Sequence, residues 1–154
     1  MPSDIQVALY QPDIAGNTGT ILRTAACLGF KVHMIEPAGF DASARSLKRS
    51  GMDYLAMASL TRHADWTRFE AWRHEQKLPL TLLTTKASEP YTSADLAAPQ
   101  ILLFGSESSG VPEHIHELAD QRITIPMQPE ARSLNLAVSV GIVAGEAIRQ
   151  QTLS

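Results

Sequence analysis

The feature that most limits the fold of this chain is a series of short, continuously apolar segments that alternate with helical patterns. Continuous apolar runs indicate strands buried on both faces, and helices between successive strands are typical of parallel sheets. The pattern therefore predicts an α/β fold in which helices cover both faces of a mostly parallel sheet. The expected strands are residues 5–10, 31–35, 55–58, 80–84, 101–104 and 122–125, and the expected helices are residues 17–28, 43–50, 65–75, 112–119 and 135–150.

Local signals refine the helices. Asn17 or Thr18 is expected to cap the first helix, and Gly29 is expected to end it. The last helix follows a loop with two prolines, and Ser133 is expected to cap it. An aromatic stripe in the helix over residues 65–75 is expected to pack onto the sheet, and it consists of Trp66, Phe69 and Trp72.

Length and composition indicate an ordinary globular protein. At 154 residues the chain has the length of a single domain, residues 1–154. No apolar run approaches the roughly 20 residues of a membrane helix, and the N-terminus lacks the pattern of a secretory signal. The single cysteine, Cys27, excludes a disulfide framework within one chain and favours a reducing, cytoplasmic compartment. Cys27 lies in an apolar helical pattern and is expected in the core.

The charge pattern leaves two readings of one basic segment open. The formal net charge of −3 argues weakly against a nucleic-acid partner, whose phosphates a binding protein must neutralise. Arg45, Lys48 and Arg49, however, fall at helical spacing in a stretch without acidic residues. They form either a solvated helix face or a basic patch for nucleic acid.

Three loops are expected to meet at one edge of the sheet. The segments TKASEP, GSESSGVP and PMQPEAR each leave the carboxyl end of an expected strand. Ligands of parallel α/β sheets bind beyond the carboxyl ends of the strands. Pro126 and Pro129 restrict the backbone of the third loop, which suits a preformed binding loop. The candidate site is therefore at this edge.

Common catalytic motifs do not account for these loops. The segment GSESSG lacks the Lys and Ser or Thr of a phosphate-binding loop, and it lacks the G-x-S-x-G pattern of a hydrolase. The alternative to a binding loop is therefore a simple turn without a ligand. His114 and His116 are two apart on an expected helix and point to different sides, so a metal pair is not expected. Arg23 lies on the first helix, where it either reaches the candidate site or forms a surface salt bridge.

Three longer motifs resemble a known family. They are PDIAGNTGTILRTAACLGFKVHMIEP at residues 12–37, LLFGSESSGVP at 102–112 and IPMQPEARSLNL at 125–136. In this order and spacing they resemble the motifs of the SPOUT methyltransferases, in the SpoU/TrmH branch. Within that branch the chain is most similar to the YibK-like tRNA wobble-nucleotide 2′-O-methyltransferases, a form without an appended RNA-binding domain. The resemblance implies a C-terminal trefoil knot and a homodimer with active sites shared between subunits.

The resemblance also implies roles for individual residues, with S-adenosylmethionine as methyl donor and no metal. Arg23, Glu107 and Asn135 match catalytic positions, and Arg23 is expected to orient the ribose 2′-hydroxyl, with transient proton loss from its guanidinium as the alternative. The expected tRNA contacts are Arg45, Lys48, Arg49 and Arg132. The expected cofactor site consists of Leu83, Gly105, Ile125, Met127, Ser133 and Leu134, and Gly105 is expected to let the cofactor approach the backbone closely.

The chain departs from the family after SLNL. Ala137 and Val138 stand where relatives often have a Ser-Asn pair, and Gly145 stands where they often have an aromatic residue. The main expectation is 2′-O-methylation of the tRNA wobble nucleotide, cytidine or uridine at position 34. The alternatives are another tRNA or rRNA site, a catalytically silent RNA-binding module, and a small-molecule hydrolase.

Overall fold

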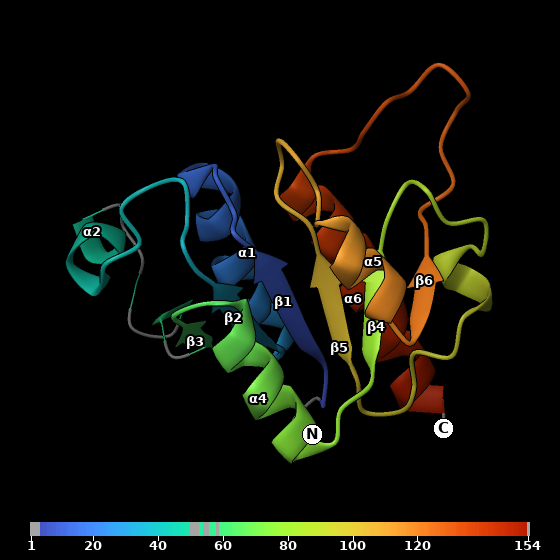
Figure 1. The fold of residues 1–154 in the computed structure, drawn as a ribbon, viewed down its shortest axis with the longest axis horizontal. Helices are drawn as coiled ribbons and strands as arrows, with labels where there is room; N and C mark the ends of the chain where they lie inside the picture. The colour runs from blue at the N-terminus through green and yellow to red at the C-terminus, as the bar shows by residue number, and fades with distance from the viewer. Residues whose placement is uncertain (1–3, 50–52, 54–55, 58, 154) are drawn as a thin grey trace.

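A computed structural model describes residues 4–49, 53, 56–57 and 59–153 of the chain (Figure 1). Its sheet has the strand order β3-β2-β1-β5-β4-β6, and all five pairings between these strands are parallel. The predicted parallel α/β sheet is therefore confirmed. The strands are β1 (Gln6–Tyr10), β2 (Lys31–Ile35), β3 (Leu60–His63), β4 (Leu80–Leu83), β5 (Ile101–Phe104) and β6 (Gln121–Ile123).

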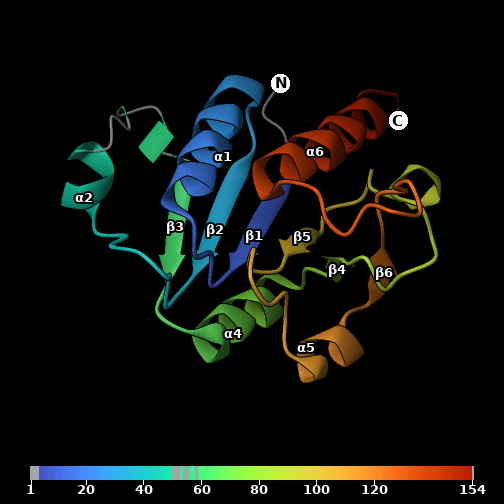
Figure 2. The same ribbon diagram turned by 90° about the horizontal axis from the view of Figure 1, so that it is seen from above.

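Helices cover both faces of the sheet, as expected. In Figure 2, α1 and α6 lie side by side on one face, and α4 and α5 lie on the other. The helices are α1 (Ala15–Leu28), α2 (Ala44–Arg49), α4 (Trp66–Gln76), α5 (Glu113–Leu118) and α6 (Leu136–Leu153), with a 3-10 turn η1 (Tyr91–Ser93).

Each face of the sheet has its own apolar core. Under α1 and α6, alternate residues of β1 such as Val7 and Leu9 pack with buried helix residues such as Leu22 and Val143. Under α4 and α5, the predicted aromatic stripe packs onto the sheet, with Phe69 fully buried and Trp66 and Trp72 partly buried beside it. These two cores hold the strand ends and helix ends that form the site.

The edge strand β3 corrects one prediction. A strand was expected at residues 55–58, but Ala56 and Met57 are helical, and residues 55 and 58 lie outside the described part of the chain. The strand follows at Leu60–His63, where β2 is its only partner among the described strands. Its middle residues are exposed because an edge strand faces solvent, and Arg62 forms an ion pair of 2.7 Å with Glu36. The segment therefore lacks the apolar run of a central strand.

The ends of α1 confirm one prediction and correct two. Gly29 ends the helix in the left-handed conformation, at φ +84°, as expected. The helix begins before Asn17, at Ala15, and its N-cap residue Ile14 makes no side-chain capping bond. The expected core residue Cys27 is exposed instead, because the buried side of α1 is formed by other residues.

The start of α6 corrects the expected cap. Asn135, not Ser133, stands directly before the helix, and its Oδ1 accepts a hydrogen bond of 3.1 Å from the Val138 amide. The far end of α6 is attached to the connection between β4 and β5. There the Gln150 side chain accepts from the Leu96 amide at 2.7 Å and donates to the Ala94 carbonyl at 3.0 Å.

The strands β4, β5 and β6 end level with one another. Leu83 is in register with Phe104 of β5 and with Ile123 of β6. The three loops that follow these strands therefore leave the sheet at the same edge, as predicted. Over the part of the chain that the structure describes, none of the helices has the length and apolar character needed for a membrane crossing.

Candidate functional site

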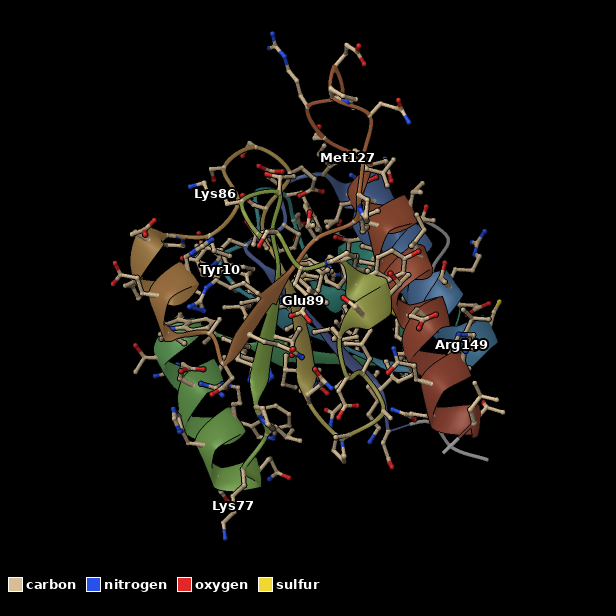
Figure 3. All side chains as sticks on the ribbon, turned by 90° about the vertical axis from the view of Figure 1, so that its right-hand side faces the viewer. Tyr10, Lys77, Lys86, Glu89, Met127 and Arg149 are labelled. Carbon is tan, nitrogen blue, oxygen red and sulfur yellow. The ribbon has the colours of Figure 1, made fainter. Side chains whose placement is uncertain are left out.

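An open pocket of about 570 Å³ lies beyond the carboxyl ends of β4, β5 and β6. This volume is in the range of small-ligand sites. Figure 3 shows the loop after β6 projecting beyond the sheet, with Met127 labelled near its base. Eight of the residues expected to bind cofactor or take part in catalysis line the pocket, namely Leu83, Gly105, Glu107, Ile125, Met127, Ser133, Leu134 and Asn135.

Glu107 binds the start of α1. Its carboxylate accepts hydrogen bonds from the backbone amides of Asp13 at 3.0 Å and Ile14 at 3.2 Å. Amides at a helix N-terminus lack partners within the helix and carry the positive end of its dipole, so a carboxylate stabilises them. Glu107 therefore supplies from the loop after β5 the cap that Ile14 lacks.

Asn17 joins this carboxylate to α6. Its Nδ2 donates to Glu107 at 3.1 Å, and its Oδ1 accepts from Asn135 Nδ2 at 3.0 Å. The chain Glu107–Asn17–Asn135 therefore connects residues of all three sequence motifs. Sequence reasoning identified Glu107 and Asn135 but assigned Asn17 only a capping role. The N-T-G motif was the available signal for Asn17.

Gly105 is required by the loop itself. A β-carbon at this position would lie 2.6 Å from the Gly110 α-carbon, closer than real β-carbons approach backbone atoms. The close approach follows from two backbone hydrogen bonds between Ser106 and Gly110, at 3.1 and 3.0 Å, which close the loop. The structure thus adds a steric reason for glycine at position 105, independent of a bound cofactor.

A second contact holds the same loop against the entry of α1. The Ser108 hydroxyl hydrogen-bonds the carboxylate of Asp13. This bond is the main reason that the pKa of Asp13 is held below its usual range, although partial desolvation opposes it. The loop after β5 is therefore tied to α1 through both Glu107 and Ser108.

The basic residues expected at the site lie outside the pocket. Arg23 is exposed on α1, about 9 Å along the helix axis from Asn17. Arg45, Lys48 and Arg49 are exposed on α2, which buries Leu47. Figure 1 shows α2 at the β3 side of the molecule, whereas the loop with the exposed Arg132 projects at the β6 side. A single chain therefore does not gather these residues.

The pocket also includes residues that sequence reasoning did not assign to it. Lys86, on the loop after β4, lines it and is labelled in Figure 3. His116 lines it from α5, while His114 is exposed, so the two histidines point to different sides, as expected. Within residues 4–49, 53, 56–57 and 59–153, no group of three or more His, Cys, Asp and Glu side chains is placed to hold a metal ion.

Comparisons with known proteins agree on one family. Residues 4–145 match the family model described as the SpoU rRNA Methylase family. A tRNA (cytidine(34)-2′-O)-methyltransferase of Beijerinckia indica is 54% identical over 144 residues, which are 94% of this chain and 90% of that protein. A solved structure concerned with the 2-OH methylation of C/U34 on tRNA has a TM-score of 0.84 and 38% identity, over 96% of this chain and 91% of that one.

A third comparison concerns a ligand. An AdoMet-bound rRNA methyltransferase from Sinorhizobium meliloti has a TM-score of 0.83 and 28% identity with this chain. The match covers 97% of this chain and 57% of that longer one.

Proposed function

Because the chain belongs to the SpoU rRNA methylase family, we propose that it transfers a methyl group from S-adenosylmethionine to the ribose 2′-hydroxyl of tRNA nucleotide 34. The wobble nucleotide is cytidine or uridine, as in the relatives that match along almost the whole chain. The observation that supports this most directly is that residues of all three motifs meet in one pocket.

The pocket residues suit S-adenosylmethionine. Leu83 and Ile125 offer apolar surface to a purine, Leu134 adds apolar surface beside Asn135, and Ser133 and Asn135 offer polar groups. A mixture of this kind is typical of nucleotide-like ligands. When bound, the cofactor supplies a methyl group that its sulfonium charge has already activated.

The protein's own residues supply position and charge. Arg23 orients the 2′-hydroxyl and holds a neighbouring phosphate, because a guanidinium has a fork of donors and stays protonated. Glu107 is a positioning residue in this account, since its hydrogen bonds fix the start of α1 and the amide of Asn17. Asn135 completes the alignment at the start of α6. Alignment for in-line attack is the main contribution that such a site makes.

A homodimer resolves the position of Arg23. Two large apolar side chains that line the pocket are exposed, Ile14 at 50% and Leu134 at 40%, and Val138 in the first turn of α6 is exposed at 49%. A second copy would cover this apolar surface and bring its own Arg23 to the pocket. It would also place a second set of Arg45, Lys48, Arg49 and Arg132 beside the tRNA backbone.

The chain is also proposed to be knotted. The connection between β4 and β5 is bound on one side by Gln150 of α6 and on the other by Thr124, which exchanges backbone hydrogen bonds of 2.9 Å with Glu89 and Tyr91. Both contacts are expected if α6 passes through this connection. Pulling the termini apart would test it, because a tightened knot leaves the unfolded chain shorter than the roughly 3.3–3.6 Å per residue of a free chain.

Methyl transfer by the purified protein tests the proposed function. Total tRNA and total rRNA would be incubated separately with S-adenosylmethionine labelled in its methyl group. Label is expected in tRNA, which we assign to the enzyme as its substrate. The reaction is proposed to take place in the cytoplasm. Label in rRNA alone would contradict the substrate, and binding of tRNA without transfer would identify a silent RNA-binding module.

A further inference from the structure

The imidazole of His116 is not among the groups assigned to methyl transfer. The ring lines the pocket from α5, and its Nε2 is buried without a hydrogen-bond partner among the described residues. A buried polar atom without a partner is costly and rare in native proteins. Its partner is therefore expected to come from a molecule that enters the pocket.

The position of His116 is well defined. The preceding residue, Ile115, is fully buried in the core under α4 and α5 and anchors the short helix. The backbone amide of His116 donates to the Pro112 carbonyl at 3.2 Å, which fixes the backbone of residue 116 within α5. A side chain on so fixed a backbone suits ligand recognition.

The pocket has two ends of different character. Asn17 and Asn135 line it from α1 and the start of α6, on the side assigned to methyl transfer. His116 lies on α5, which packs on the opposite face of the sheet beside buried residues such as Leu82. The part of the cofactor near His116 would therefore lie on the α5 side of the pocket, away from Asn17 and Asn135 (Figure 2).

The chemistry of this end favours a neutral ligand group. The amino-acid part of S-adenosylmethionine carries an ammonium and a carboxylate, which are costly to bury beside apolar residues. Adenine is uncharged, and its edge offers both a donor and acceptors, so it matches Nε2 in either tautomer. We infer that His116 hydrogen-bonds the adenine base and thereby contributes to the specificity of this enzyme for its cofactor, an inference that rests on the proposed function.

Two probes and three variants test this inference. Calorimetry would measure the affinity of S-adenosylhomocysteine and of 5′-methylthioadenosine, which has the adenosine part but not the amino-acid part. His116→Phe keeps a planar ring and removes both nitrogens, so it should weaken binding of both probes about equally, on the order of 10- to 100-fold. His116→Gln places an amide nitrogen near the Nε2 position and should recover most of the loss. His114→Phe changes an exposed histidine on the same helix and should bind as wild type.

The outcomes distinguish this inference from the proposed function. Unchanged affinity of both His116 variants for both probes would overturn the inference and leave the enzyme assignment standing. Loss for S-adenosylhomocysteine alone would place His116 at the amino-acid end and would also overturn it. Failure of the wild-type protein to bind either probe would contradict the proposed function itself.

Discussion

Replacing Glu107 by alanine should destabilise the protein as well as impair it. The substitution removes three hydrogen bonds to a carboxylate, from the Asp13 and Ile14 amides and from the Asn17 side chain. Hydrogen bonds to charged groups contribute about 1.5–3 kcal/mol each when isolated, but bonds that share one carboxylate are not additive. The carboxylate also complements the N-terminus of α1, by about 0.3–1 kcal/mol. Since Glu107 is only partly buried, we expect a total loss of about 2–3 kcal/mol.

Urea unfolding at pH 7 and fixed protein concentration measures this loss, with the concentration held constant because the proposed dimer would make the stability depend on it. Glu107→Gln keeps an acceptor but removes the charge, so it should lose about 1 kcal/mol. Glu117→Ala, an exposed acid on α5, is the matched control and should stay within about 0.5 kcal/mol of wild type. If Glu107→Ala also stays within that range, the carboxylate does not cap α1, and its positioning role is refuted.

Three further predictions address chemistry, pH and packing. Arg23→Ala should keep cofactor affinity but reduce the single-turnover rate of tRNA methylation by about 100-fold. Arg23→Lys should not restore this rate, because an ammonium lacks the fork of donors of a guanidinium. Rates of Arg23→Ala within a few-fold of wild type would exclude a role of the guanidinium in orienting the 2′-hydroxyl. Burial and the neighbouring His63 lower the pKa of His33 to about 4, below the 6.5 of a free histidine. As the pH falls, the unfolded chain therefore binds the extra proton before the folded chain does. The free energy of unfolding should decrease by about 2 kcal/mol between pH 6.5 and 5. Equal urea midpoints at pH 7 and 5 would contradict this. Gly105→Ala should weaken S-adenosylhomocysteine binding because its β-carbon meets the Gly110 backbone, and calorimetry showing wild-type affinity would exclude that clash.

The central strands could be predicted because they are apolar on both faces. Leu82 and Leu103, for example, are buried and belong to short, continuously apolar strands. Polar segments separate these strands along the sequence, so each apolar run is easy to recognise. The edge strand β3 could not be predicted in this way, since half of its residues face solvent and one of them, Arg62, pairs with Glu36. The strand is specified by its neighbour β2 and not by its own hydrophobicity.

The helix caps show a second limit of local reasoning. Asn17 has the side chain of a good N-cap, but the first turn of α1 is capped by Glu107, a residue about 90 positions away in the chain. This frees Asn17 to bridge Glu107 and Asn135. The eight pocket residues were identified because their motifs resemble those of the family, and these motifs follow strand ends. Arg23 and the basic residues lie outside the pocket of the single chain, and a sequence alone does not show whether a second subunit brings them to it.

Methyl transfer to one defined ribose is the decisive test of the proposed reaction. Two versions of a tRNA with cytidine at position 34 would be compared, one with ribose and one with 2′-deoxyribose at that nucleotide. Labelled methyl groups from S-adenosylmethionine would be located by nuclease digestion and mass spectrometry. We predict one methyl group on the ribose of nucleotide 34 and none on the deoxy version. Equal labelling of both tRNAs, or a methyl group on any other nucleotide, would contradict it.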